Sequence, residues 1–291
     1  MEDYQLLDFG DGRRLERLGS WLLDRPAPGT EELVKGDADL WQQVDARYEG
    51  ERAAAGQWTI LNGSLNDASA SIGNINFADF ALSLRLAPSG QVGVFPEQAE
   101  NWSWIDEQVR AFQSKHQRPP RVLNLFAYTG GSTLAAASAG GEVAHVDSSQ
   151  SVVNWARENA AQSNLEAAPI RWLVEDATRF VERELRRGNS YDGIILDPPS
   201  YGHGGGKRIW KIEQHLAPLL ANCLELGGDG LSFLLLTAHT PEFNSKRLEQ
   251  LLRETPGADQ FDELSSGCLE IKAADGRRLM AGNFVRATSH Q

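Results

Sequence analysis

From Arg121 to Glu254 the chain alternates between short apolar runs and longer amphipathic segments, and this alternation limits the folds that it can adopt. The apolar runs are rich in Val, Ile and Leu, whereas the segments between them space their apolar residues at the period of a helix. We expect strands at 121–127, 142–147, 170–175, 192–196 and 231–237, and helices at 132–139, 149–165, 178–187, 211–226 and 245–254. A β-α unit that recurs about every thirty residues predicts a doubly wound parallel sheet.

The end of the chain breaks this alternation. Leu269–Lys272 and Leu279–Arg286 flank Asp275-Gly276, a dipeptide that is typical of a hairpin turn. A hairpin at the end of a parallel sheet adds two antiparallel strands at one edge, next to the five strands expected before it. The predicted fold class is therefore α/β, with a doubly wound, mostly parallel seven-stranded sheet that ends in an antiparallel hairpin.

The amino-terminal part of the chain follows another pattern. Residues 1–100 carry many Gly, Pro and Asn turn formers, and short alternating runs such as Phe80–Leu86 lie between them, which predicts a small β-rich region. Residues 101–120 are expected to form a helix, at 104–114, and a polar linker. Residues 121–291 then form the α/β domain.

The composition is that of a globular chain with an acidic excess: 291 residues, 41% hydrophobic, with a net charge of −12. No apolar run approaches the length of a transmembrane helix, and the start of the chain lacks the apolar core of a secretory signal. Cys223 and Cys268 lie far apart, so we expect no disulfide, no metal site and a reducing cytoplasm as the location. The chain as a whole lacks the basic excess of proteins that rely on phosphate contacts.

The fourth expected strand ends in an acid, Asp197, that two prolines and an aromatic residue follow at once. Open α/β sheets bind their ligands at the carboxyl ends of the strands, where Asp197 is expected to lie. Pro198 and Pro199 end strand pairing and stiffen the chain, which holds the Asp197 carboxylate near the prolyl carbonyls and the Tyr201 ring. Carboxylate and carbonyl oxygens accept the hydrogens of an amino group. The motif therefore predicts a site for an amine on a flat ring.

A glycine-rich stretch and a basic cluster follow this motif. Gly202–Gly206 suggests a loop over the site. Lys207, Arg208 and Lys211 could meet the phosphates of a nucleic acid, or they could begin a helix and face water. Elsewhere, the pair Arg277-Arg278 at the predicted turn is interpreted as solvated charge.

The other strand ends carry candidate ligands of a cofactor. The first strand runs into Tyr128-Thr129-Gly130-Gly131-Ser132, whose glycines either admit a ligand close to the backbone or make a plain tight turn. Asp147 ends the second strand, where a carboxylate can bind the hydroxyls of a ribose or cap the next helix, a task that the serines after it can take instead. Asp176 ends the third strand and could accept from an adenine amino group or cap a helix at Thr178.

These strand ends together favour an adenosine ligand, either a nicotinamide dinucleotide or S-adenosylmethionine. A dinucleotide requires a pyrophosphate cradle with the G-x-G-x-x-G spacing, which this chain lacks. S-adenosylmethionine has no phosphate, and acidic and aromatic neighbours stabilise its sulfonium cation. The sequence therefore favours S-adenosylmethionine as the cofactor.

Several motifs resemble those of class I S-adenosylmethionine-dependent methyltransferases: Val122–Ser132, Val146-Asp147, Glu175–Ala177 and Leu196–Tyr201. The resemblance covers Val92 to Arg286 and is closest to the large-subunit ribosomal RNA methyltransferase group that includes the bacterial 23S rRNA cytosine-C5 enzymes. The resemblance implies contacts of the methionine part with Phe126, Tyr128, Thr129 and Gly130, of the ribose with Asp147, of the adenine with Asp176 and Ala177, and of the methyl-transfer region with Asp197.

The segment Val94–Trp102 is similar to one that packs over the cofactor in that group. This similarity makes Phe95 and Gln98 candidate cofactor contacts, although simple core packing also explains Phe95. An amino-terminal RNA-binding PUA domain, common in that group, finds no clear counterpart in the short amino-terminal region.

One departure from the group concerns the mechanism. Carbon-5 of cytosine is a poor nucleophile, so its methylation needs a thiolate that adds to the ring, and in the cytosine enzymes that cysteine follows the fifth strand. Here the fifth strand ends in Leu236-Thr237-Ala238-His239-Thr240, which contains no cysteine. Cys223 and Cys268 are interpreted as small packing residues. We therefore expect direct displacement at a nitrogen or an oxygen.

For an exocyclic amine, Asp197 and the Pro198 carbonyl would accept the N–H bonds, and Tyr201 would stack on the base after it leaves its helix. His239 is either a general base or a histidine that fills a pocket at the end of the strand. The favoured hypothesis is an S-adenosylmethionine-dependent methyltransferase that acts on a ribosomal RNA base at nitrogen. The alternatives are a protein or metabolite methyltransferase, a dinucleotide-binding oxidoreductase and a non-catalytic cofactor-binding protein. No membrane partner is expected, and the sequence does not predict an oligomeric state.

Overall fold

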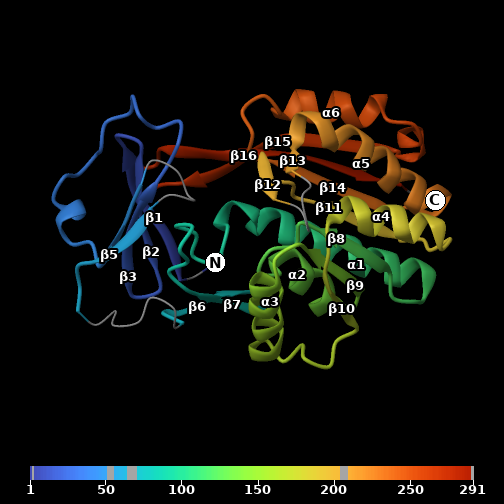
Figure 1. The fold of residues 1–291 in the computed structure, drawn as a ribbon, viewed down its shortest axis with the longest axis horizontal. Coiled ribbons are helices and arrows are strands. Elements are labelled where there is room, and N and C mark those ends of the chain that lie inside the picture. The colour runs from blue at the N-terminus through green and yellow to red at the C-terminus, as the bar shows by residue number, and fades with distance from the viewer. Residues whose placement is uncertain (2, 51–55, 64–70, 204–208, 290–291) are drawn as a thin grey trace. The chain divides into compact units, whose positions relative to one another are not determined.

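The computed structural model of the protein describes residues 1, 3–50, 56–63, 71–203 and 209–289. The chain divides into two compact units (Figure 1). The first comprises Met1–Ala99 and Glu270–Met280, and the second comprises Glu100–Leu269 and Ala281–Gln291. The division expected from the sequence kept all residues from 121 onward in one domain, whereas the turn of the terminal hairpin here counts with the first unit.

The first unit is built on a five-stranded sheet whose strands follow chain order, β1-β2-β3-β4-β5. Its strands are β1 Tyr4–Gly10, β2 Arg13–Leu18, β3 Trp21–Pro26, β4 Ala46–Glu49 and β5 Gln57–Ile60, with a short 3-10 helix, η1, at Leu40–Gln42. Neighbouring strands pair antiparallel except β3 and β4, which run parallel. A separate hairpin, β6 Gly73–Phe77 and β7 Phe80–Leu84, and a 3-10 helix, η2 at Pro96–Gln98, follow. The small β-rich region predicted from the turn formers is confirmed.

Arg277 is not the solvated residue that the sequence suggested. Its guanidinium pairs with the carboxylate of Asp8 and donates to the carbonyl oxygens of Phe9 at 3.0 Å and Val34 at 3.1 Å. Asp8 is 2% exposed and also accepts from Nε1 of Trp41 at 2.7 Å. A buried carboxylate that loses its partner costs about 3–5 kcal/mol. For Arg277 the interpretation as solvated charge was wrong because the partner lies 269 positions away, where no local pattern reveals it. The side chain of Arg278 is 68% exposed, as the interpretation expected.

The second unit contains a seven-stranded sheet in the order β10-β9-β8-β11-β14-β16-β15. Its strands are β8 Arg121–Leu125, β9 Glu142–Asp147, β10 Ile170–Val174, β11 Gly193–Leu196, β14 Phe233–Ala238, β15 Glu263–Lys272 and β16 Arg278–Thr288. The pairs from β10 to β14 are parallel, and β16 runs antiparallel to β14. The predicted fold class, including the terminal hairpin, is confirmed.

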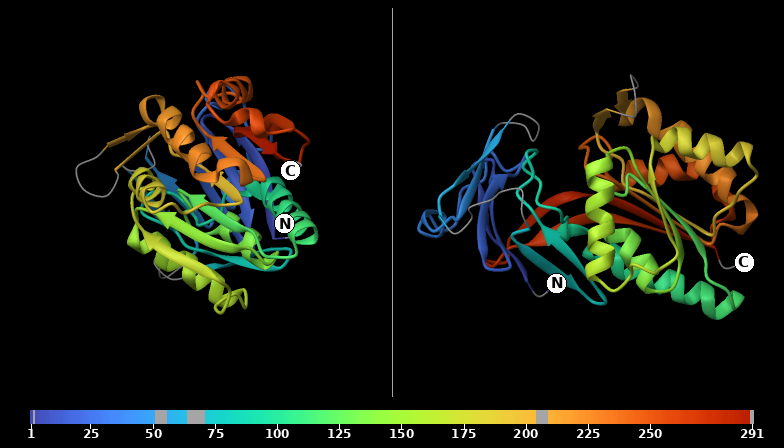
Figure 2. Two further views of the ribbon diagram at one scale, coloured as in Figure 1. Left: turned by 90° about the vertical axis from the view of Figure 1, so that its right-hand side faces the viewer. Right: turned by 60° about the horizontal axis from the view of Figure 1, so that its bottom comes forward.

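Six helices among the described residues accompany this sheet: α1 Ala99–His116, α2 Gly131–Ser138, α3 Gln150–Gln162, α4 Ala177–Arg186, α5 Ile212–Gly227 and α6 Ser245–Glu254. Helices α1 to α3 cover one face, and α4 to α6 cover the other (Figure 1, Figure 2). Two 3-10 helices, η3 Gly228–Gly230 and η4 Ala258–Gln260, and a two-stranded hairpin, β12 Tyr201–His203 with β13 Ile209–Lys211, complete the unit. Within the described parts of the chain, no helix combines the length and the apolar character needed to cross a membrane.

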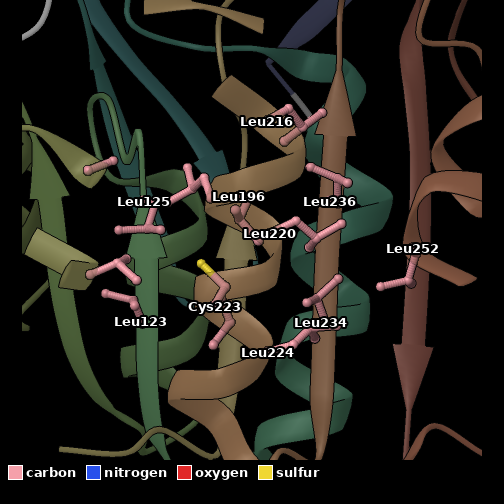
Figure 3. Packing of buried hydrophobic residues seen from close by; sticks show 14 of the residues in the cluster. Leu123, Leu125, Leu196, Leu216, Leu220, Cys223, Leu224, Leu234, Leu236 and Leu252 are labelled. Carbon is pink, nitrogen blue, oxygen red and sulfur yellow. The ribbon is translucent and has the colours of Figure 1, made fainter. Parts of the chain in front are cut away.

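The main core lies between the sheet and helices α4 to α6 (Figure 3). Its strand residues include Leu123, Leu125, Leu196, Leu234 and Leu236, and its helix residues include Leu216, Leu220, Leu224 and Leu252. Cys223 lies among them without exposure, and burial raises the pKa of its thiol. The central strands are buried on both faces, which is why their sequence reads as continuous apolar runs. This packing fixes the strand ends on which the candidate site is built.

Candidate active site

The carboxyl ends of the central strands lie in register along one edge of the sheet. The pairing of β8, β11 and β14 places Phe126, Asp197 and Thr237 side by side. On the other side of β8, β9 ends at Asp147, and Asp176 follows the end of β10. The structure therefore brings the strand-end acids predicted from the sequence to a single edge of the second unit.

Asp197 is held by two side chains from the end of the neighbouring strand, β14. The Thr237 hydroxyl donates to its Oδ1, and Nε2 of His239 lies 3.2 Å from the same oxygen. Thr237 is 1% exposed, whereas 28% of the Asp197 side chain is exposed. Pro198, next in the chain, is buried. The carboxylate is thus anchored on one side by a buried hydroxyl and is open to solvent on another.

The orientation of His239 fixes which of its nitrogens can exchange a proton. Nδ1 lies 2.7 Å from the carbonyl oxygen of Ala281, which can only accept, so Nδ1 carries a hydrogen. A neutral ring would then turn the lone pair of Nε2 toward the Asp197 carboxylate. In this form Nε2 can take up a proton at the Asp197 oxygen that it faces. The ring has room because residue 282 is glycine: a Cβ at Gly282 would lie 2.8 Å from Nδ1.

The turn after β8 has an unusual backbone. Phe126 has a φ of 57°, Tyr128 of 48° and Gly130 of 94°, so left-handed residues alternate along it. For residues with side chains such conformations cost about 1–3 kcal/mol each and persist only where the surroundings hold them. The N–H of Tyr128 donates to Oδ2 of Asp147 at 3.0 Å, and Nδ2 of Asn159 donates to the carbonyl of Thr129 at 2.9 Å. Strain of this kind is often found where a turn binds a ligand.

The turn leads into α2, whose amino terminus is open to an anion. The N-cap residue, Gly130, has no side chain and so makes no side-chain capping bond to the helix. The backbone N–H groups of a first helical turn carry partial positive charge and bind anions. Trp102 packs closely beside this turn, since a Cβ at Gly131 would lie 2.5 Å from its ring atom Cζ2. Gly131 thus makes room for Trp102, and the close approach of a ligand to this turn stays a prediction.

Asp147 is tied to the same turn. Its Oδ2 accepts from Tyr128 and its Oδ1 accepts from the N–H of Ser149 at 2.9 Å. Burial raises the pKa of Asp147, against the lowering effect of these hydrogen bonds. Ser149, and not Asp147, is the N-cap of α3, where it accepts from Val152. The capping task is therefore taken by a serine, which leaves Asp147 as a fixed acceptor beside the turn.

Asp176 does cap a helix. Its Oδ1 accepts from the N–H of Arg179 at 3.0 Å, and α4 begins at the next residue, Ala177, which is 6% exposed. The helix thus begins one residue earlier than the capping interpretation placed it. An adenine contact of Asp176 and Ala177 stays a prediction.

Phe95 and Gln98 belong to the first unit. Phe95 precedes η2 and is half-buried, and Gln98 ends η2 and is 5% exposed. Their contact with the cofactor stays a prediction.

The chain that leaves Asp197 turns into the β12–β13 hairpin, which the sequence did not predict. Tyr201, the candidate stacking residue, begins β12 and is 52% exposed. Trp210 in β13 is 7% exposed, and its Nε1 donates to the carbonyl of Pro199 at 2.7 Å. The alternation of Ile209, Trp210 and Lys211 after a glycine run was a signal for a hairpin. Residues 204–208, which include most of the expected glycine loop with Lys207 and Arg208, lie outside the described residues.

A cavity of about 650 Å³ lies elsewhere in the second unit, beside α1 and the start of β14. Trp104, Phe233 and Arg286 are among the residues that line it, and none of the strand-end acids is. Among the residues that the structure describes, no three His, Cys, Asp or Glu side chains gather as a metal site.

The chain belongs to the S-adenosylmethionine-dependent methyltransferase family, whose sequence pattern matches residues 71–276. An S-adenosylmethionine-dependent methyltransferase from Agrobacterium tumefaciens of known structure is 35% identical, with a TM-score of 0.88 over 98% of this chain and 90% of that one. The family therefore gives S-adenosylmethionine as the methyl donor.

Curated relatives include two proteins named for ribosomal RNA. The ribosomal RNA large subunit methyltransferase K/L of Pseudoalteromonas atlantica is 36% identical over 134 residues, which are 43% of this chain and 18% of that protein. The ribosomal RNA large subunit methyltransferase I of Tolumonas auensis is 30% identical over 129 residues, which are 44% of this chain and 30% of that protein. The matches thus span less than a third of the length of either relative.

Proposed function

We propose that this methyltransferase transfers a methyl group to a nitrogen of an RNA base, with ribosomal RNA as the substrate. The observation that carries the proposal is the Asp197 carboxylate, anchored by Thr237 and partly open at the carboxyl edge, where it can accept the hydrogens of an amine. The names of the relatives support RNA as the substrate class. Membership of the family favours this reading over a dinucleotide-binding oxidoreductase.

The residues at the edge fit S-adenosylmethionine. The uncapped start of α2 and the glycines before it suit the methionine carboxylate, with Phe126, Tyr128 and Thr129 along the turn. The Asp147 carboxylate accepts backbone hydrogen bonds from Tyr128, Ser148 and Ser149, and its two oxygens retain capacity to accept from a ribose hydroxyl. Asp176 likewise uses one oxygen for its cap. These contacts are our proposal for how the donor is held.

Bound S-adenosylmethionine supplies a methyl carbon that is electrophilic because it is attached to a sulfonium. In our proposal Asp197 and the carbonyl of Pro198 accept hydrogen bonds from the two N–H groups of the base amine. These two bonds orient the amine so that its lone pair points at that carbon. The new N–C bond forms as the C–S bond breaks and its electron pair stays on sulfur. Tyr201 stacks on the flipped base, and fixed geometry supplies most of the rate.

The methylated nitrogen must then lose a proton, and the Asp197–His239 pair is built to receive it. His239 is fixed through Nδ1, so exchange is confined to Nε2, the nitrogen that faces Asp197. The proton passes to Asp197 and leaves through Nε2 of His239. We therefore favour the general-base prediction for His239 over the pocket-filling alternative. With 30% of its side chain exposed, His239 can pass a proton to solvent.

The described cysteines do not suit methylation at carbon. Cys223 is buried in the core, and burial raises the pKa of its thiol. Sγ of Cys268 lies 3.7 Å from the side-chain oxygen of Asn283, on the outer hairpin. A thiolate that adds to a base ring should instead stand at the edge, where this chain has His239.

The proposal is tested by comparing modified nucleosides from a deletion strain and its parent by mass spectrometry. We expect one nitrogen-methylated nucleoside to disappear from ribosomal RNA and to return with the wild-type gene but not with Asp197→Asn. Loss of a carbon-methylated nucleoside would reject attack at nitrogen. Transfer of labelled methyl to protein but never to RNA, with purified enzyme, would reject RNA as the substrate. A ribosomal RNA substrate also agrees with the cytoplasmic location that the sequence predicts.

A further inference from the structure

The β12–β13 hairpin has an outer and an inner face. Its register pairs Tyr201 with Lys211 and Gly202 with Trp210. Because side chains alternate along a strand, Tyr201 and Lys211 share one face and Trp210 lies on the other. Tyr201 is 52% exposed and Ile209 is 46% exposed, whereas Trp210 is buried. The hairpin therefore presents an aromatic, an aliphatic and a basic side chain outward, and it is anchored inward by one indole.

Trp210 makes contact with both chain segments that form the site. Its indole N–H donates to the carbonyl oxygen of Pro199, two residues after Asp197. Its ring centroid lies 4.8 Å from that of Phe126, with the planes tilted by 58°. Phe126 is the first residue of the strained turn after β8. One side chain thus joins the segment that leaves Asp197 to the turn that we assign to the donor.

The backbone of Phe126 makes this contact matter. A left-handed φ of 57° is unfavourable for a bulky residue and persists only where neighbours hold it. Phe126 is half-buried, and Trp210 packs directly on its ring. Loss of the indole would remove one of the contacts that keep Phe126, and with it the start of the turn, in place.

The base of the hairpin is fixed on the other side of Asp197 as well. The N–H of Ile212 donates to the carbonyl of Ser200 at 3.1 Å. The Ser200 hydroxyl lies 2.6 Å from that of Thr240, the residue after His239. These two hydrogen bonds link the base of the hairpin to the segments that carry Asp197 and His239.

We propose that Trp210 is a positioning residue that couples the two halves of the site. It holds the turn at Phe126 in the form that binds the donor and holds the hairpin in the form that receives the acceptor. Donor affinity then depends on a residue of the acceptor side that does not itself touch the donor. The inference rests on the proposed placement of S-adenosylmethionine at the Phe126 turn.

Binding of S-adenosylhomocysteine, measured by calorimetry without RNA, tests the coupling. Trp210→Leu should weaken binding about two- to tenfold, the range that one aromatic pair supplies. Trp210→Phe, which keeps a ring against Phe126, should recover most of the affinity. In the Phe126→Leu background the further change Trp210→Leu should have little effect, because the contact through which it acts is already gone.

Trp104→Leu is the matched control. Trp104 in α1 packs edge-on against Phe233 with ring centroids 5.8 Å apart, at the start of β14 and away from the carboxyl edge. The Trp104→Leu substitution should lower the melting temperature without changing S-adenosylhomocysteine affinity. The inference is overturned if folded Trp210→Leu binds like wild type, if Trp104→Leu weakens binding equally, or if the effects of Trp210→Leu and Phe126→Leu add fully.

The outcome is separable from the proposed function. Methyl transfer to a protein would reject the RNA substrate, but it would not alter the S-adenosylhomocysteine affinities expected for the variants. Failure of the wild-type protein to bind S-adenosylhomocysteine would overturn the donor placement and this inference together.

Discussion

Asp197→Asn isolates the acceptor chemistry, because it exchanges one oxygen for an amide nitrogen at constant shape. The asparagine oxygen can still receive the Thr237 hydroxyl, so the amide nitrogen would face the acceptor amine. The lost hydrogen bond to a charged acceptor is worth about 1.5–3 kcal/mol, and the two donors left facing each other cost about 1–3 kcal/mol more. At 1.36 kcal/mol for each factor of ten, the methyl-transfer rate should fall by roughly 10²- to 10⁴-fold.

Single-turnover transfer of labelled methyl from S-adenosylmethionine to ribosomal RNA from a deletion strain measures this rate. S-adenosylhomocysteine affinity should change by less than about threefold, since Asp197 is assigned to the acceptor. Asp192→Asn is the control: Asp192 precedes the same strand at its amino end and pairs with Arg118 at 2.7 Å and 2.8 Å. It should lower stability and leave the rate unchanged. A rate for Asp197→Asn within about tenfold of wild type would refute the role that we assign to the carboxylate.

Three further substitutions test the surroundings. Gly131→Ala should lower the free energy of unfolding, measured in urea. The new Cβ would lie 2.5 Å from Trp102, and this overpacking costs about 1–3 kcal/mol, which exceeds the gain of about 0.5–1 kcal/mol from replacing a helical glycine. A net increase in stability would contradict the close packing. Burial lowers the pKa of His145 to about 3, so the stability that its neutral form provides is complete above pH 6.5 and is lost as the pH falls toward 3. When the pH falls from 7.5 to 5.5, the free energy of unfolding measured in urea should fall by about 1.4 kcal/mol more for wild type than for His145→Gln. Equal losses in the two proteins would contradict the burial of a neutral His145. Cys268→Ser should keep methyl transfer within about twofold, whereas inactivation would restore a thiolate mechanism.

The fold could be predicted from the sequence because its strands are buried on both faces. Continuous apolar runs mark such strands, and the acids Asp147 and Asp197 mark where they end. The β12–β13 hairpin escaped prediction because its strands have three residues each and follow a glycine run that suggests a loop. Such short strands depend on an anchor, here Trp210, whose partners Phe126 and Pro199 are supplied by the fold.

The same distinction separates what the sequence could say about the site from what it could not. Asp176 has a local partner, the N–H of Arg179, three residues later in the chain. Its capping bond could therefore be predicted from the sequence, beside the alternative of an adenine contact. Thr237 and His239 meet Asp197 only because β14 lies in register beside β11, about 40 positions away in the chain. The proton on Nδ1 of His239 depends in turn on a carbonyl of β16, a third strand. The chemical state of the Asp197–His239 pair is therefore a property of strand register, and substitutions that shift β16 against β14 should change the pH dependence of methyl transfer without touching either residue.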